Sequence, residues 1–421
     1  MAERRLGLGF IGLGQAMNLI LQRRWELDGL PIDIVAGADP RQGARARFVA
    51  DFGGSAYASA EELCADPAVD IVYIATGPEL HREHASLAAR HGKHMIVEKP
   101  LALTVEDCLA IVKEAEEYGV LVVAGHTHSF GAPYLKMAEL VHSGALGELV
   151  MVNSWMYNEF NPRPWPTAEL ESTRGPLLNQ GPHQVDIVRQ IAGGEVTSLR
   201  ATTFHDSLRG VLGGYTALLT FAGGASANIV FDARGFFDVA ELFGWIGEGG
   251  QPKEPDRPFT MRRNFKEVDA LGPELREQRL HEQKELGRYG AKAVTAEEWA
   301  LWGYSFGQEH HQPFFGLTVA SCERGAIRQS ADGLYIYGET EVSEISLASA
   351  QRGRAAELME LYGGVVEGRP LVHDARWATG TIEVCLAIEA SARLQAEVPL
   401  VHQTAYGSIQ PDRSSMDRRR A

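Results

Sequence analysis

The sequence predicts a two-domain protein, with an α/β domain built on a doubly wound parallel sheet followed by an α+β domain with a large, mostly antiparallel open sheet. Over residues 1–125, short apolar runs alternate with amphipathic segments, which is the rhythm of β-α-β units. From 126 to 404, long strand-like runs follow one another instead. The length of 421 residues is sufficient for two or three domains.

Each element of the first domain is predicted from an apolar run or a helix-start signal. The predicted strands are residues 6–11, 32–38, 71–75, 94–97 and 120–124. The predicted helices are residues 16–27, 41–51, 82–90 and 104–118. Ser59-Ala-Glu-Glu62 forms a capping box that opens a further short helix. Continuous apolar strands between helices are typical of a parallel sheet covered on both faces.

The second domain is predicted mainly from longer strands. These are residues 149–157, 196–204, 215–221, 225–231, 316–322 and 333–337. Helices are expected at residues 180–191, 350–365 and 376–396. The glycines between Phe221 and Ala225 predict a hairpin turn. Residues from about 248 to 300 are charged and indicate an insertion with some helix, and the polar residues 405–421 indicate a disordered tail.

Charge and cysteine usage exclude several classes of protein. The chain has 40 Lys and Arg against 55 Asp and Glu, a net charge of −15, which disfavours nucleic acids and anionic membranes as partners. We find no apolar run long enough for a transmembrane helix. The four cysteines contain no C-x-x-C pair, which predicts reduced thiols in a cytoplasmic protein.

A glycine turn joins the first predicted strand to the first helix. Its sequence is Gly12-Leu-Gly14-Gln-Ala-Met17. Glycines there let the backbone turn sharply and approach a pyrophosphate at the helix N-terminus. Met17 replaces the third glycine of the usual motif, and a tight turn without a ligand is the alternative interpretation. The candidate cofactor-binding residues are Gly12, Leu13, Gly14, Gln15 and Ala16.

An acidic residue ends the second predicted strand. Asp39 lies 27 residues after Gly12, where a carboxylate would bind the ribose 2′-hydroxyl of a dinucleotide. A carboxylate repels a 2′-phosphate, so NAD is the expected cofactor, while Arg41 leaves NADP as an alternative. Taken alone, Asp39-Pro40 is also compatible with a simple turn.

A lysine follows the fourth strand in the motif Glu98-Lys99-Pro100. The carboxyl end of a parallel strand borders the crevice in which such sheets bind ligands. A partly desolvated ammonium there can hydrogen-bond a substrate hydroxyl and stabilise an alkoxide-like oxygen. The alternative is a loop lysine paired with Glu98.

Asn179 and His183 lie four residues apart at the start of a predicted helix, so their side chains share one face. Histidine titrates near neutral pH and suits proton transfer. Asp186, three residues further on, could orient the His183 ring or be solvated. A capping asparagine and a packed histidine are the alternative interpretation.

Four motifs together resemble the glucose-fructose oxidoreductase / inositol dehydrogenase (Gfo/Idh/MocA) family over nearly the whole chain. They are GFIGLG at the start, Ala75-Thr76 with His81 five residues after Thr76, GKHMIVEKPL at 92–101, and Gly175 with Asn179, His183 and Asp186. The resemblance implies a Rossmann domain, hydride transfer with a nicotinamide, and a homodimer or homotetramer formed through the outer face of the second sheet.

The resemblance also assigns roles to individual residues. It implies that Lys99 activates the substrate, that His183 is the acid/base, and that the Lys99-Pro100 bond is cis. It adds Thr76, Pro78, His81, Glu98 and Lys99 to the cofactor site.

Two departures from the family pattern matter. Asn179 stands where the family commonly has aspartate and cannot accept a proton, so a hydrogen-bonding role is expected. Gly77 stands where a proline usually follows the threonine, with Pro78 one place later, so a different nicotinamide loop is expected.

A finer resemblance points to the cis-dihydrodiol dehydrogenases of phthalate breakdown. The matching stretches are Gly125–Phe130, Pro162–Pro164, Gly181–Asp186, Gly244–Glu248 and Ser321–Glu323. It implies oxidation of 4,5-dihydroxy-4,5-dihydrophthalate to 4,5-dihydroxyphthalate. A substrate with two carboxylates needs cationic partners when desolvated. The candidate substrate-binding residues are His126, His128, Arg163, Arg174 and Asp186.

Two other functions stay open. One is a sugar or cyclitol dehydrogenase of the same family, and the other is a non-catalytic nucleotide-binding sensor, against which the presence of both Lys99 and His183 speaks. No metal role is expected, because His81-x-x-His84 and His126-x-His128 lack a third ligand at a recognisable spacing.

Overall fold

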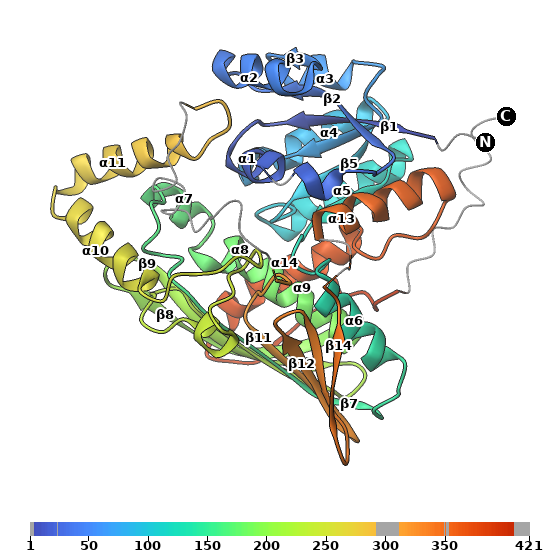
Figure 1. Cartoon of the computed structure of the whole chain (residues 1–421), viewed down its shortest axis with the longest axis vertical. Helices are drawn as coiled ribbons and strands as arrows, with labels where there is room; N and C mark the ends of the chain where they lie inside the picture. The colour runs from blue at the N-terminus through green and yellow to red at the C-terminus, as the bar shows by residue number, and fades with distance from the viewer. Residues whose placement is uncertain (1–3, 23, 292–310, 349, 351–352, 408–421) are drawn as a thin grey trace.

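The computed structural model describes residues 4–22, 24–291, 311–348, 350 and 353–407. It contains a six-stranded and a nine-stranded sheet, with helices packed between them (Figure 1). This confirms the predicted fold class. Residues 292–300 of the predicted insertion and 408–421 of the predicted tail lie outside the described residues.

The first sheet is wholly parallel and has the strand order β3-β2-β1-β4-β5-β6. Its strands are β1 (Leu6–Ile11), β2 (Ile32–Ala38), β3 (Ser55–Tyr57), β4 (Ile71–Ile74), β5 (His94–Glu98) and β6 (Val122–Gly125). β3 is too short and too exposed to have been predicted. The strand order reverses between β1 and β4, which is where sheets of this kind open a ligand crevice.

The helices of the first domain begin and end at recognisable signals. They are α1 (Gln15–Gln22), α2 (Gln42–Phe52), α3 (Ala60–Cys64), α4 (His81–Arg90) and α5 (Val105–Tyr118), with 3₁₀ turns at Arg24–Leu27 and Pro78–Leu80. Ser59 and Glu62 form the predicted capping box at α3. Gly53 and Gly119 end α2 and α5 in the left-handed conformation that glycine adopts without strain.

The second sheet has the order β14-β13-β12-β11-β7-β10-β9-β8-β15, and its pairs are antiparallel except for β10 with β7. The predicted strands are β7 (Leu149–Tyr157), β8 (Val196–Asp206), β9 (Val211–Phe221), β10 (Ser226–Asp232), β11 (Leu317–Cys322) and β13 (Gly333–Tyr337). Sequence analysis missed β12 (Gly325–Ser330), β14 (Val342–Ser346) and β15 (Val398–Pro399). β12 and β14 are polar or short hairpin partners with no continuous apolar run.

Helices cover the face of the second sheet that points toward the first domain (Figure 1). They include α6 (Ala132–His142), α7 (Thr167–Ser172), α8 (Pro176–Asn179), α9 (Gly181–Ala192) and α14 (Ala375–Leu394). The insertion forms α10 (Arg257–Asp269) and α11 (Pro273–Leu286). Tyr134 of α6, Val188 of α9 and Ile388 of α14 share one core with the strands beneath them.

The chain returns to the first domain near its end. Leu358, Leu361 and Tyr362 of α13 (Gly353–Tyr362) pack into the core beneath the six-stranded sheet. Ile382 of α14 packs into the core on the opposite face. The C-terminal helices therefore tie the two domains together, although sequence analysis places them in the second domain. No described helix is long and apolar enough to cross a membrane.

Candidate active site

The turn between β1 and α1 is shaped for a pyrophosphate. Gly12 has a φ of +92°, and a Cβ there would lie 2.9 Å from the backbone of Ala75, so only glycine fits. A Cβ on Gly14 would meet nothing closer than 3.9 Å. This opening leaves the backbone N–H groups of residues 14–16 accessible to an anion. Met17, which replaces the third glycine, is fully buried and fills the core instead.

Asp39 borders this turn, and its carboxylate is engaged by a neighbouring arginine. The Leu13 N–H donates to Oδ2 of Asp39 at 3.0 Å, and Arg41 donates to both carboxylate oxygens. Arg41 also donates to the carbonyl oxygen of Leu13 at 2.6 Å. A ribose diol therefore reaches the carboxylate only when Arg41 turns aside. The residues fit NAD, and the displaced guanidinium would stand beside the 2′-position.

Replacing Asp39 with asparagine is expected to move cofactor preference toward NADP⁺. The change removes the charge that repels a 2′-phosphate and releases Arg41 to pair with one. We expect the ratio of kcat/KM for NADP⁺ to that for NAD⁺ to rise about tenfold or more, measured by initial rates. Asp33→Asn, at the other end of β2 and paired with Arg5, is the matched control. An unchanged ratio in Asp39→Asn would reduce Asp39 to a turn residue.

His81 joins two loops of the crevice from within the protein. Its Nδ1 lies 2.9 Å from the carbonyl oxygen of Pro100 and its Nε2 3.2 Å from that of Thr76. The ring is fully buried, so the prediction that it contacts the cofactor is wrong. Its role is to hold the Thr76 loop, which continues into Pro78, against the cis Lys99-Pro100 bond, whose isomer is as predicted.

Glu98 belongs to a buried polar cluster beneath the crevice. The Tyr73 hydroxyl donates to Oε1 of Glu98 at 2.8 Å, and Arg354 donates to the same oxygen at 3.0 Å. Burial alone would raise the pKa of Glu98, but Arg354 and Lys99 hold it below its ordinary value. In the neighbouring Glu357, burial raises the pKa to about 7. Glu98 thus has partners inside the protein, and its contact with a cofactor stays a prediction.

The Lys99 side chain bridges the two domains by binding Asn179. Its Nζ donates to the backbone oxygen of Asn179 at 2.9 Å and to Oδ1 at 3.2 Å. Gln180 donates to the same Oδ1 at 2.9 Å, which fixes the amide as an acceptor. Burial lowers the pKa of Lys99, while the charges of Glu98 and Glu248 oppose that shift. The alternative of a simple Glu98–Lys99 side-chain pair is therefore wrong.

His183 is held in an aromatic corner at the start of α9. The His128 ring packs edge-on at a centroid distance of 4.5 Å and an angle of 87°, and Phe315 lies at 5.2 Å. Burial, together with the positive charges of His128 and Lys99, holds the pKa of His183 well below its ordinary value. The ring is therefore neutral at neutral pH and able to accept a proton.

Glu248 is a site residue that sequence reasoning did not single out. Its Oε1 accepts from Arg163 at 2.9 Å and from Asn158 at 2.9 Å. Burial would raise its pKa, but Arg163 holds it lower, so the carboxylate is ionised. Arg163 also binds Glu159 at 3.1 Å. With two carboxylate partners, Arg163 supports the site wall, contrary to its predicted contact with substrate.

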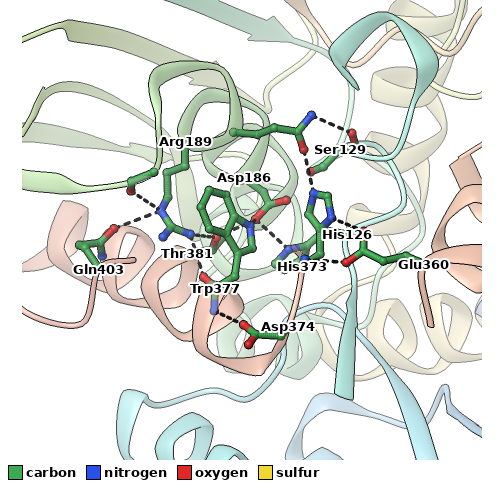
Figure 2. A network of polar contacts seen from close by, with 12 residues as sticks. His126, Ser129, Asp186, Arg189, Glu360, His373, Asp374, Trp377, Thr381 and Gln403 are labelled. Atoms are coloured by element: carbon green, nitrogen blue, oxygen red, sulfur yellow. Dashed lines mark hydrogen bonds and ion pairs between the residues drawn. The ribbon is translucent and has the colours of Figure 1, made fainter. Parts of the chain in front are cut away.

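Asp186 and His126 lie behind the site in a buried polar network (Figure 2). Oδ1 of Asp186 accepts from the Trp377 indole at 2.6 Å and from Thr381 at 2.8 Å, and Nδ1 of His126 lies 3.0 Å away. Burial alone would raise the pKa of Asp186, yet His126 keeps it well below its ordinary value. Both residues are fully buried, so their prediction as substrate-binding residues is wrong. They fix α9 against α14.

Arg174 faces a different cavity from Lys99. Its Nε lies 3.4 Å from Glu389 of α14, and the two residues line a surface cavity of about 300 Å³ together with Leu103 and Arg393. Arg174 therefore lies outside the site that contains Lys99, and its predicted contact with the substrate is not supported there. In the part of the chain that the structure describes, no group of three metal-ligating side chains forms.

The structure thus brings Lys99, Asn179, His183 and His128 together after the carboxyl end of β5, in the same parallel sheet whose β1 leads into the glycine turn. A nucleotide-binding turn, a desolvated ammonium and a neutral histidine together define an NAD-dependent dehydrogenase.

Comparison with known protein families supports the same class of enzyme. Residues 6–126 match the oxidoreductase family with an NAD-binding Rossmann fold, and 134–237 match the GFO/IDH/MocA C-terminal domain. The chain belongs to the Gfo/Idh/MocA family of oxidoreductases.

Individual relatives match from about half to nearly all of the chain. A 1-carboxy-3-chloro-3,4-dihydroxycyclohexa-1,5-diene dehydrogenase from Comamonas testosteroni is 31% identical over 90% of this chain and 93% of its own length. Inositol 2-dehydrogenase 2 from Saccharopolyspora erythraea is 32% identical over 47% of this chain and 57% of its own. A crystal structure from Bordetella bronchiseptica RB50 has a TM-score of 0.83 and 30% identity, covering 94% of this chain and all of that one.

Proposed function

We propose that the protein is an NAD-dependent dehydrogenase of cyclic diols that carry a carboxylate, with 4,5-dihydroxy-4,5-dihydrophthalate as the specific candidate. The observation that carries the proposal is the Lys99 ammonium, held by Asn179 at 2.9 Å and 3.2 Å in the same site as the neutral His183 ring. The substrate class is supported by the relative from Comamonas testosteroni, whose name describes a carboxylated dihydroxycyclohexadiene.

The residues act on the hydroxyl that is oxidised. Lys99 donates a hydrogen bond to this oxygen and stabilises the negative charge that develops on it. His183 takes the hydroxyl proton. NAD⁺, when bound along the carboxyl edge of the sheet, supplies the hydride acceptor for the hydrogen on the same carbon. Asn179 accepts hydrogen bonds from Lys99 and keeps the ammonium aimed into the site.

Aromaticity gives the reaction its direction. Loss of a hydride from one carbinol carbon and of the proton from its hydroxyl group leaves a ketone. The hydrogen on the neighbouring carbinol carbon is then lost as a proton while the ketone oxygen gains one, and the ring becomes a catechol. The sum is dihydrodiol and NAD⁺ giving catechol, NADH and one proton. A cyclitol has no such aromatic product, so its oxidation would remain reversible.

His128 is the predicted cation best situated for a substrate carboxylate. It lies edge-on against His183 and is partly exposed, whereas His126 is buried. The substrates to test therefore include the phthalate dihydrodiol, which carries two carboxylates, and a monocarboxylated dihydrodiol like the one in the name of the Comamonas testosteroni relative.

The test is a substrate panel followed by NADH absorbance. It contains carboxylated cis-dihydrodiols, the matching dihydrodiols without a carboxylate, and cyclitols such as inositol. We expect kcat/KM for the carboxylated dihydrodiols to exceed that for cyclitols by about 100-fold or more, because an unpaired buried polar group is costly. A preference for cyclitols would overturn the proposal in favour of the inositol-type activity that the Saccharopolyspora erythraea relative carries.

We also propose the outer face of the nine-stranded sheet as the subunit interface. Exposed apolar side chains gather on its strands, with Met151 and Trp155 on β7 and Leu218 on β9. Their exposed fractions are 37%, 41% and 53%. Such a surface favours association. The homodimer or homotetramer expected from the family resemblance stays a prediction.

A further inference from the structure

The insertion is anchored on the second domain by α11. The Thr167 N–H and hydroxyl donate to the carboxylate of Glu277 at 2.9 Å and 2.5 Å. Lys284, near the end of α11, forms a close ion pair with Glu169. Thr167 and Glu169 belong to α7, which precedes the segment that carries Asn179. The helix is therefore fixed to the part of the second domain that leads into the active site.

The residues that follow α11 reach the first domain, as Figure 1 shows for the loop that approaches α1. We call residues 287–291 the strap. The buried Asn18 side chain donates to the carbonyl oxygen of Gly287 at 3.0 Å. The Tyr289 N–H donates to the carbonyl oxygen of Gly14 at 3.2 Å, and its hydroxyl donates to Asp51 at 2.7 Å. The strap thus binds α1, α2 and the dinucleotide turn itself.

The strap lies directly against backbone at the start of α2. Gly290 has a φ of +76°, and a Cβ there would lie 2.6 Å from Cα of Ala44. Tyr289 is 4% exposed and belongs to the apolar core that contains Leu13 and Phe48. The contact is therefore a packed domain interface that tolerates no added methyl group.

These contacts place the strap across one end of the cofactor crevice. Gly14 lies at one margin of this crevice, just before α1. Ala44 lies at the other margin, in the first turn of α2. Asp39 and Arg41 lie between the two margins, where the ribose of the adenosine half would bind. The strap, which lies outside the first domain, contacts both margins.

We propose that the strap is part of the dinucleotide site: residues 287–291 position the glycine turn and the start of α2 and retain the cofactor. The strap is anchored through α11 on the second domain, so it holds the two margins at a fixed separation. It also covers the adenosine side, so cofactor release requires the strap to separate from Gly14 and Ala44. Tyr289 and Gly290 are positioning residues in this account.

Gly290→Ala is the direct test, because one methyl group must push the strap away from Ala44. Gly272→Ala, at a φ of +86° in the same insertion, is the matched control, because its Cβ would meet nothing within 4 Å. We expect the Kd for NAD⁺, measured by calorimetry, to rise about tenfold or more in Gly290→Ala. The NADH dissociation rate, measured by stopped-flow fluorescence, should rise with it, and both values in Gly272→Ala should stay within about twofold.

Tyr289→Phe decides the matter if Gly290→Ala does not fold, because it removes only the hydroxyl that binds Asp51. We expect its NADH dissociation rate to rise about threefold or more. Wild-type values in a folded Gly290→Ala, or in Tyr289→Phe where Gly290→Ala is unfolded, would refute the role of the strap. A wild-type protein that binds no NAD⁺ would instead overturn the dinucleotide site and the proposed function. If the wild-type protein bound NAD⁺ but oxidised no compound of the substrate panel, the binding experiments would still test the strap, and the substrate proposal would be wrong.

Discussion

Lys99→Met is expected to lower kcat/KM by about 100-fold or more, the cost of losing a donor that stabilises charge in the transition state. Methionine keeps the length of the side chain but cannot donate to the oxygen of the substrate. The loss should fall mainly on kcat, because the hydrogen bond strengthens as negative charge develops. Initial rates with the best substrate of the panel measure it. A change within about threefold would exclude Lys99 as the stabilising group.

The pH dependence provides a second measure of the same residue. Burial lowers the pKa of Lys99, so its ammonium loses a proton at a pH below the ordinary lysine value of about 10.4. We expect kcat/KM of the wild-type enzyme to fall on the alkaline side at such a pH. Lys113→Met, an exposed lysine on α5, should leave both the rate and this alkaline limb unchanged.

His183→Asn should lower kcat by about 100-fold to 10,000-fold, the usual contribution of a positioned base. In the wild-type enzyme, burial and the positive charges of His128 and Lys99 lower the pKa of His183. A histidine with a lowered pKa is neutral above that pKa and loses its capacity as a base only below it. The acid limb of kcat/KM should therefore lie below the ordinary histidine value of about 6.5.

His205→Asn, an exposed histidine on β8, is the control for this substitution. Thermal unfolding of both variants separates a loss of base from a loss of fold. An acid limb that persists unchanged in His183→Asn, with the rate near wild type, would assign proton transfer to another group. His128, edge-on against the same ring, would then be the first residue to examine.

Local sequence was sufficient to place the glycine turn and to single out Lys99 and His183, whose roles in the reaction remain proposals. Gly12 requires a left-handed backbone, Lys99 follows a buried strand, and His183 lies in the first turn of α9. Each of these features depends on neighbours within a few residues along the chain. Their coming together depends on the doubly wound sheet, whose strand order follows from apolar runs that alternate with helices. Asn179 ends α8, the helix that precedes α9, so the prediction that Asn179 and His183 share one helix face is wrong.

The substrate-binding prediction failed where distant residues act on one another. Arg163 looks like a free cation in the sequence, but Glu248, 85 residues away, binds it. Asp186 looks like an orienting partner for His183, but the Trp377 indole, 191 residues away, binds it in the interior. Whether a charged side chain meets solvent or a buried partner is a property of packing, and residue type does not reveal it.

The amino-acid order alone therefore determined the two-domain architecture and the glycine turn, because each follows from periodicity or from short-range stereochemistry. The three-dimensional arrangement decided which cations are available, brought Glu248 to the site wall and laid the strap against Gly14 and Ala44. These features depend on desolvation and on contacts between segments remote in the chain. Such contacts exist only after the chain has folded.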